Sequence, residues 1–201
     1  MTEDRRLRIG GWAALVAAII APVEVVAVVL LTDGSPAVTP RMVALIEIAR
    51  IGALLVAVIG LHGLFRSMAP SIAAPIRLLG ALAAVIGIGV DLALLATVEP
   101  GSIADVLALA VSVLIGVWFI GGGAILMREG NGLARIGWTA ELGGVGIILS
   151  ALAITVRLTG PGAAGMTWTN WFQVLGLFVV VYLVRLWRYV VGGRMPGPGI
   201  L

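Results

Sequence analysis

The feature that most constrains this chain is a series of six apolar stretches, each about 20 to 25 residues long. A helix of that length crosses a hydrocarbon core of about 30 Å. Because lipid cannot hydrogen-bond the backbone, spanning segments must be helical or form closed barrels. The stretches lie near residues 9–31, 42–65, 76–98, 103–127, 134–156 and 168–187. The predicted fold class is therefore all-α, a polytopic membrane bundle of six transmembrane helices.

The composition points to lipid as the solvent for most of the surface. Of the 201 residues, 61% are hydrophobic and only 11% are charged, whereas soluble domains carry about 25% charged residues. The connections between the apolar stretches are short and contain glycine or proline, which interrupt helices. None is long enough to hold a separate domain, so residues 1–201 are expected to form a single transmembrane domain.

Arginine residues predict the orientation of the chain. With the N-terminus in the cytoplasm, only Arg41 and Arg157 lie on the outer side, and Arg50 lies within the second stretch. The remaining arginines all fall on the cytoplasmic side: Arg5, Arg6, Arg8, Arg66, Arg77, Arg128, Arg135, Arg185, Arg188 and Arg194. Such an excess of basic residues is typical of cytoplasmic loops. Ala, Val, Gly and Arg are abundant, as in GC-rich bacterial genomes. The predicted location is the bacterial cytoplasmic (inner) membrane, with a multi-pass topology and both termini cytoplasmic.

Several classes of chemistry are excluded by missing residue types. The chain has no cysteine and no lysine, and His62 is its single histidine. Disulfides, thiolate metal sites, iron–sulfur clusters, cysteine nucleophiles and Schiff bases are therefore impossible. The arginines are scattered at helix ends, which gives no reason to expect a nucleic acid partner. We expect no cofactor and no metal. The expected partners are the lipid bilayer, a small-molecule or lipid ligand, and further copies of the chain in a homo-oligomer.

Two short motifs resemble a known family. Arg8-Ile9-Gly10 opens the first stretch, and the segment 127–137 reads Met-Arg-Glu-Gly-Asn-Gly-Leu-Ala-Arg-Ile-Gly. Both are similar to a bacterial family of six-helix integral membrane proteins that is catalogued as a domain of unknown function. Ala134 stands where that family usually has proline, and glycine follows Ile136 directly. The resemblance implies the six-helix fold and implies no activity.

Ionisable residues occur inside the stretches at similar depth. A charge at the bilayer centre costs about 2.5 kcal/mol or more, and such residues usually face a cavity, a partner or a pathway. Counted at 1.5 Å per residue, the members of this set lie roughly 5–13 Å from the outer helix ends. They are Glu24, Glu47, Arg50 and Asp91, with the polar Asn170 and Gln173 of the last stretch, and Trp171 as a further lining residue. Matched depth predicts an outward-facing polar pocket within the membrane.

Two interpretations of this set stay open. Glu47 and Arg50 are spaced i,i+3, so they share a helix face and can pair. The first interpretation is a salt-bridge network that only fixes the order of the helices. The second is a pocket in which Arg50 faces Glu24, Glu47 and Asp91. There the excess of negative charge would keep a proton on one carboxyl, which could then carry protons or act as a general acid.

A second, weaker pair lies in the inner half of the predicted bundle. His62 is about one turn from Arg66, and Glu141 lies roughly 9 Å from Arg135. If they met, they would extend a proton path from the outer set towards the cytoplasm. Alternatively, His62 reaches water at the interface, and Glu141 pairs with a nearby arginine.

Glycines and alanines on the fourth and fifth stretches predict close packing of the two helices. Small residues allow two membrane helices to bring their backbones together. The positions are Gly116, Gly121, Gly122, Gly123, Gly137, Ala140, Gly143, Gly144 and Gly146.

Three functions are compatible with this pattern. The first is a small proton-linked transporter or carrier that uses the intramembrane acids. The second is a non-catalytic accessory or interaction protein, in which the charges hold helices together. The third is a membrane-embedded acid–base enzyme acting on a lipid or isoprenoid. No nucleophile, metal or cofactor motif supports the enzyme, so a non-enzymatic role is favoured, and no catalytic residue is assigned.

Overall fold

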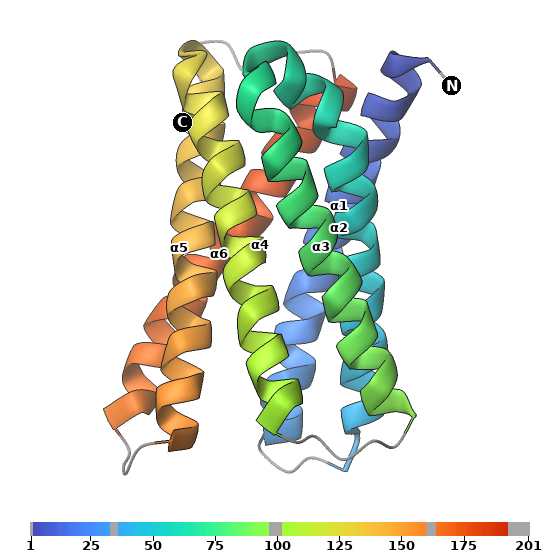
Figure 1. The fold of residues 1–201 in the computed structure, drawn as a ribbon. Helices are drawn as coiled ribbons and strands as arrows, with labels where there is room; N and C mark the ends of the chain where they lie inside the picture. The colour runs from blue at the N-terminus through green and yellow to red at the C-terminus, as the bar shows by residue number, and fades with distance from the viewer. Residues whose placement is uncertain (1, 33–35, 97–101, 160–163, 193–201) are drawn as a thin grey trace.

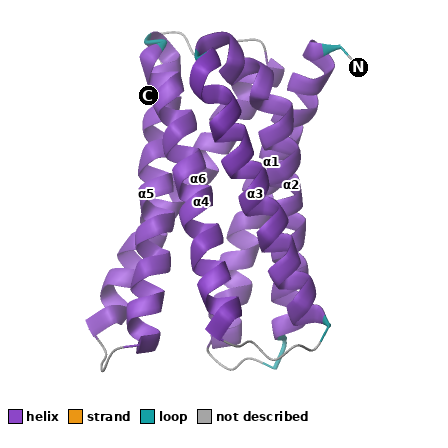
Figure 2. Cartoon of the chain, viewed as in Figure 1, coloured by secondary structure: helices purple, strands orange, loops and turns teal. Residues whose placement is uncertain are grey.

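The computed structural model of the chain is an up-and-down arrangement of six helices (Figure 1). It describes residues 2–32, 36–96, 102–159 and 164–192, except for the side chains of 32, 102–105, 131, 154–174 and 176. The helices are α1 (Glu3–Thr32), α2 (Pro40–Met68), α3 (Pro70–Leu95), α4 (Ser102–Arg128), α5 (Asn131–Thr159) and α6 (Ala164–Gly192). No strand occurs in the part of the chain that the structure describes (Figure 2).

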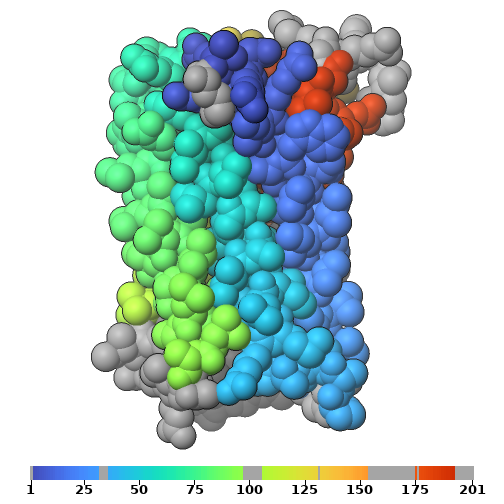
Figure 3. Space-filling model, turned by 90° about the vertical axis from the view of Figure 1, so that its right-hand side faces the viewer, coloured from blue at the N-terminus to red at the C-terminus, as the bar shows by residue number. Residues whose placement is uncertain are grey.

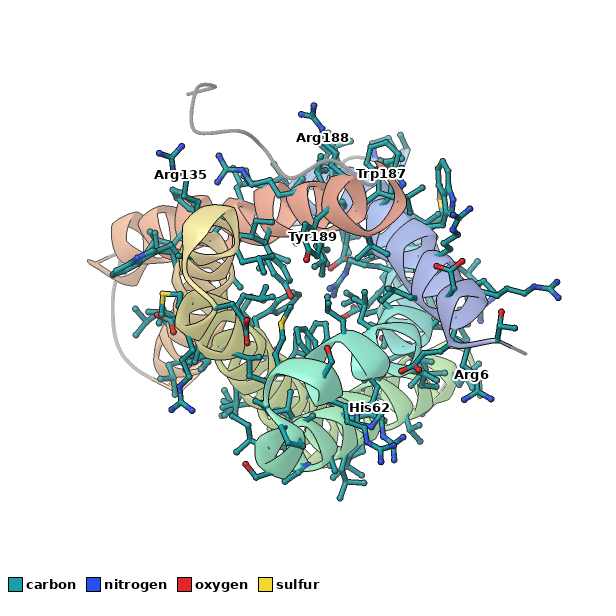
Figure 4. The ribbon with its side chains drawn as sticks, turned by 90° about the horizontal axis from the view of Figure 1, so that it is seen from above. Arg6, His62, Arg135, Trp187, Arg188 and Tyr189 are labelled. Atoms are coloured by element: carbon teal, nitrogen blue, oxygen red, sulfur yellow. The ribbon has the colours of Figure 1, made fainter. Side chains whose placement is uncertain are left out.

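The helices form a closed ring. Each helix packs against the next one in sequence, and α6 returns to pack against α1, as the view along the bundle shows (Figure 4). α6 crosses the back of the bundle diagonally, from a start beside α5 to an end beside α1 (Figure 1). We call the end at which α1 begins the N-terminal end, and the other the opposite end.

The helices have the length and composition of membrane spans. Within the described residues, α1 to α5 are each long and apolar enough to cross a membrane. Large apolar side chains, among them Trp12, Ile19, Leu78 and Val85, are exposed on the outside of the ring. Contact of such a surface with water is unfavourable, whereas contact with lipid is not. The all-α fold and the long apolar helices expected from the sequence are thus present, and they indicate a membrane protein.

Glycines allow the closest helix contacts. A Cβ atom placed on Gly60 of α2 would lie 2.5 Å from the Cα atom of Gly10 of α1. Between α4 and α5, a Cβ on Gly144 would lie 2.6 Å from the carbonyl oxygen of Gly116, and Gly123 approaches Gly137 in the same way. The close packing of the fourth and fifth helices that the small residues predict is therefore present.

Packed side chains fill the ring on the side of the N-terminal end. Phe65, Phe119, Leu126 and Tyr182 are all buried there. Trp118 packs edge-on against Phe119 with ring centroids 4.8 Å apart, and Phe119 packs edge-on against Tyr182 at 5.6 Å. Edge-to-face pairs of this kind add to the stability gained from burial.

The helices extend beyond the predicted apolar stretches. α1 begins at Glu3 instead of residue 9, because the acidic Glu3 and Asp4 lie in its first turn, where negative charge stabilises a helix. The connection predicted over residues 66–75 shrinks to Ala69. Pro70 at the first helical position explains this difference. Proline has no amide N–H, but an N–H at that position would have no partner within the helix, so proline starts a helix without losing a hydrogen bond. The predicted end of the third stretch, Val98, lies outside the described residues.

We predict that Gly60→Ala destabilises the protein by forcing α1 and α2 apart. Overpacking of this kind costs about 1–3 kcal/mol. Gly52→Ala in the same helix is the matched control, because a Cβ at Gly52 meets no atom within 4 Å. Unfolding by sodium dodecyl sulfate titration in mixed micelles measures both variants. Equal stability of the two would show that the close approach of α1 and α2 is not required.

Candidate functional site

A cavity of about 370 Å³ lies inside the ring, on the side of the opposite end. All six helices contribute to its lining. Most of the lining side chains are apolar, and the polar ones are Glu24, Glu47, Arg50, Asp91, Ser112 and Ser150. The four ionisable residues singled out at matched depth on α1, α2 and α3 are therefore brought to one cavity.

Arg50 holds the two glutamates of the cavity. Its Nε atom donates a hydrogen bond to Oε2 of Glu24, which joins α2 to α1. Its Nη2 atom lies 3.7 Å from Oε1 of Glu47, one turn earlier on α2. The side chains of Arg50 and Glu24 are only 19% and 17% exposed. A guanidinium has five donors in a fixed plane, which suits it to binding two carboxylates at once.

Asp91 of α3 lines the cavity, and no ion pair joins it to another described side chain. The residue is only 4% exposed, and its Oδ2 atom has no hydrogen-bond partner. Across the cavity, the Oγ atom of Ser150 on α5 is also buried without a partner. Buried polar atoms are nearly always satisfied, so each exception requires an explanation. Two such atoms facing one cavity indicate that the cavity is built to hold a polar group.

Ser112 and Ser150 were not singled out from the sequence. Ser112 on α4 donates a hydrogen bond to the carbonyl oxygen of Ala108, 3.0 Å away, a common arrangement for serine within a helix. Depth could have identified Ser150, because it lies roughly 9 Å from the outer end of the fifth predicted stretch at residue 156, within the range of the other members of the set. Serine is common enough in membrane helices that depth alone is a weak signal.

The predicted polar residues of the last stretch cannot be placed in the cavity. The backbone of Asn170, Trp171 and Gln173 belongs to α6, but their side chains lie outside the described residues. The described part of α6 contributes Leu177, Val179 and Val180 to the lining.

His62 and Glu141 do not line the cavity, and no hydrogen bond or ion pair joins these two described residues. His62 on α2 faces α3, near the backbone of Ala73, and its Nδ1 atom is buried without a partner. Glu141 on α5 instead packs against α4, where its Cγ atom lies beside Gly123. The structure therefore places them on different helix pairs and shows no route from the cavity through both.

The cavity lies between two halves of the bundle. Helices pack more extensively within α1–α3 and within α4–α6 than across the two seams, α3–α4 and α1–α6. Glu24, Arg50 and Asp91 belong to the first half, whereas Ser112 and Ser150 belong to the second. A movement of one half against the other would change the cavity directly.

An aromatic layer closes the cavity towards the N-terminal end. The lining reaches Ile115 on α4 and Val179 on α6. One turn further along each helix lie Phe119 and Tyr182, both buried and packed against each other. Together with Trp118, they form the aromatic layer, and the side chains beyond it are packed. The aromatic layer therefore bounds the cavity on the side of the N-terminal end.

In comparisons with protein-family models, curated proteins and solved structures, nothing matches this chain. The family resemblance in its short motifs remains a prediction. Among the described residues, no three histidine, aspartate or glutamate side chains are grouped so that they could hold a metal ion.

We predict that Arg50→Gln strongly destabilises the protein. It would leave Glu24 and Glu47 as unpaired carboxylates, and breaking a buried ion pair in this way costs about 3 kcal/mol. Arg8→Gln is the control, because Arg8 pairs with Asp4 at 3.6 Å on a largely exposed surface. Such surface pairs contribute less than about 1 kcal/mol. Detergent unfolding should separate the two variants, and similar losses for both would contradict this account of Arg50.

Proposed function

We propose that this chain is a six-span protein of the bacterial inner membrane that carries a small molecule across it, linked to a proton on Asp91. The observation that carries the proposal is the free carboxylate oxygen of Asp91, buried in a cavity between two halves of the bundle. In this reading α6 is the sixth span, and the cavity lies in the outer half of the membrane.

Arginine placement supports this orientation. The up-and-down topology puts the start of α1, α3 and α5 and the end of α2, α4 and α6 at one end. Arg6, Arg135 and Arg188 lie around the rim of that end (Figure 4). An excess of arginine marks the cytoplasmic side. Both termini would then be cytoplasmic, and the cavity would lie towards the outside.

The charges of the cavity favour a proton on Asp91. Arg50 compensates one of the two glutamates that it contacts, so these three groups leave one negative charge. An ionised Asp91 would add a second in a medium of low dielectric, where like charges repel strongly. The described lining of α4 and α5 offers only the hydroxyls of Ser112 and Ser150. Asp91 is therefore the carboxyl that takes up a proton when no cation is present.

The two halves provide a way to expose the cavity to either side. In many transporters, one bundle rocks against another around a site near the middle of the membrane. Here the weaker seams α3–α4 and α1–α6 separate the halves, and the aromatic layer closes the cytoplasmic side. Opening requires the second half to move Phe119 and Tyr182 away from the first. Loss of charge on Asp91 would favour that movement.

The two other functions differ from a carrier in testable ways. A membrane-embedded acid–base enzyme would use the same free carboxyl of Asp91, but it would need only one opening. An accessory protein needs only the ion pair between Arg50 and Glu24 that joins α1 to α2, and neither the cavity nor the free oxygen of Asp91 would have a purpose. Alternating exposure of the cavity is the property that distinguishes the carrier.

Distances between spin labels test the alternating movement without knowledge of the substrate. The chain has no cysteine, so introduced pairs are clean labelling sites. Ser67→Cys with Glu129→Cys spans the halves at the cytoplasmic end, and Pro36→Cys with Val106→Cys spans them at the outer end; all four positions are exposed. We expect two populations for each pair. In Asp91→Asn, which mimics the protonated carboxyl, the cytoplasmic distance should lengthen while the outer distance shortens.

The same pairs in an Asp91→Ala background show whether the loss of charge or the change in side-chain size shifts the distances. Alanine removes the charge as asparagine does, but its side chain is smaller. Both variants should shift the populations in the same direction, by several-fold. A single unchanged distance for each pair, in the wild type and in both variants, would rule out the carrier.

Orientation is tested separately with single cysteines in inner-membrane vesicles. We predict that Glu129→Cys reacts with a membrane-impermeant maleimide only in inverted vesicles, because the connection between α4 and α5 is cytoplasmic. Pro36→Cys, between α1 and α2, should react only in right-side-out vesicles. The reverse result would overturn the orientation.

A further inference from the structure

We infer that the cavity takes an amphipathic organic cation, and that this ligand enters sideways from the outer leaflet between α1 and α6. The inference rests on the proposed function, because it names the class of molecule that the same cavity would carry. It depends on the charge of the cavity, on its walls and on the position of its mouth.

The polar groups of the cavity select a positively charged group. Among the described lining residues, three carboxyls, from Glu24, Glu47 and Asp91, accompany one guanidinium, that of Arg50, so their formal charge is negative. The Oδ2 atom of Asp91 is an unused acceptor, and the hydroxyl of Ser150 can accept as well. Because the described acids are not grouped as metal ligands, an organic cation fits better than a metal ion.

The walls of the cavity favour a ligand that has a large apolar part. They are formed by aliphatic side chains of five helices, including Val90, Leu94, Val111, Ile115, Ile147 and Val180. A volume of about 370 Å³ lies within the range of about 300–1,000 Å³ that is usual for small-molecule sites. A ligand that fills such a cavity and also reaches Asp91 must join an apolar part to a cationic group.

Two apolar residues mark the mouth of the cavity. Val25 of α1 and Leu177 of α6 are large side chains that line the cavity, and they are 43% and 46% exposed. The small Ala108 of α4 is the third described lining residue that is exposed. A side chain that faces both the cavity and the exterior lies at an opening. Since the two large ones, Val25 and Leu177, belong to α1 and α6, we place the mouth at the seam between these helices.

The crossing of α6 explains why this seam opens on one side. At the N-terminal end, Trp12 of α1 packs on Trp187 of α6 with ring centroids 5.4 Å apart, and Gly11 lies against Val190 and Val191. Figure 3 shows the last turns of α6 against α1 only near that end. The start of α6 lies beside α5 instead (Figure 1).

α6 does not cover the part of α1 beyond its midpoint. Val23, Val25, Val26, Val28 and Val29 are all exposed, and they cover more than one face of the helix. In the inner half of α1, by contrast, Ala14, Ala17 and Ala18 are buried. The outer part of α1 is therefore held mainly by its contact with α2.

The depth of the mouth sets the direction of entry. Val25 lies roughly 10 Å from the end of α1. If α1 spans the membrane, this position lies in the hydrocarbon region and not among the lipid headgroups. The mouth is also apolar on both sides. A ligand that reaches it must already be dissolved in the outer leaflet, as amphipathic cations are.

Binding of tetraphenylphosphonium tests the charge of the ligand. Tetraphenylborate has the same shape and the opposite charge, so it is the matched probe. Equilibrium dialysis uses the full chain in phosphatidylcholine nanodiscs, with subtraction of binding to empty nanodiscs. We expect the phosphonium to bind at least tenfold more tightly than the borate. Asp91→Asn should weaken phosphonium binding at least tenfold, whereas Glu129→Gln, which removes an exposed carboxylate far from the cavity, should not change it.

Two tryptophan variants test the route of entry. Val25→Trp fills the mouth, and Val23→Trp adds the same bulk two residues away on the same helix, where Val23 is exposed and does not line the cavity. Both positions are exposed, so both variants should fold. We expect Val25→Trp to slow phosphonium association at least tenfold, measured by stopped-flow mixing, and Val23→Trp to leave it unchanged.

Three results would overturn the inference. Equal binding of the two probes, or unchanged phosphonium binding in Asp91→Asn, would reject a cation as the ligand. Equal association rates in the two tryptophan variants would reject lateral entry. These results are distinct from failure of the carrier, because label distances that alternate without phosphonium binding would reject only the ligand class. Phosphonium binding to a protein whose distances never change would reject only the carrier.

Discussion

The contact of Arg50 with Glu24 and Glu47 is the interaction on which the rest of the site depends. It brings three charged groups into an otherwise apolar ring, and it joins α2 to the part of α1 that α6 leaves uncovered. Without the guanidinium, two carboxylates would face each other in a medium of low dielectric. With it, they are held, and among the described acids of the cavity Asp91 is the one with a buried oxygen, Oδ2, that has no hydrogen-bond partner.

Small residues pack the helices within each half of the bundle, and aromatic residues fill space between the halves. Gly10 and Gly60 bring α1 and α2 together, and Gly116 and Gly144 do the same for α4 and α5. These contacts lie within each half, so each half is tightly built. Between the halves, large described side chains fill the space on the side of the cavity that faces the N-terminal end. The result is two firm units with a weaker boundary, which is the arrangement that a rocking movement requires.

Much of this architecture is predictable from the sequence, and the reasons for the remainder are physical. Hydropathy and length identify the helices because lipid imposes both. Depth along each helix places Glu24, Arg50 and Asp91 at one level, since the rise per residue is fixed. Depth does not say which way a side chain points, so the free oxygen of Asp91 and the hydroxyl of Ser150 are visible only in the structure. The diagonal course of α6 likewise follows from packing, which hydropathy does not encode.

The aromatic layer has a consequence for the membrane potential. The voltage across a membrane protein falls most steeply in the region that contains the fewest charged or mobile polar groups, because such groups screen the electric field. In this bundle that region is the packed half that begins at Trp118, Phe119 and Tyr182, whereas the other half holds the charged cavity. Moving one charge through the full potential is worth about 2.3 kcal/mol per 100 mV. In the proposed carrier, most of that energy would act on a charge that passes the aromatic layer, so these three rings would form its electrical barrier as well as its steric one.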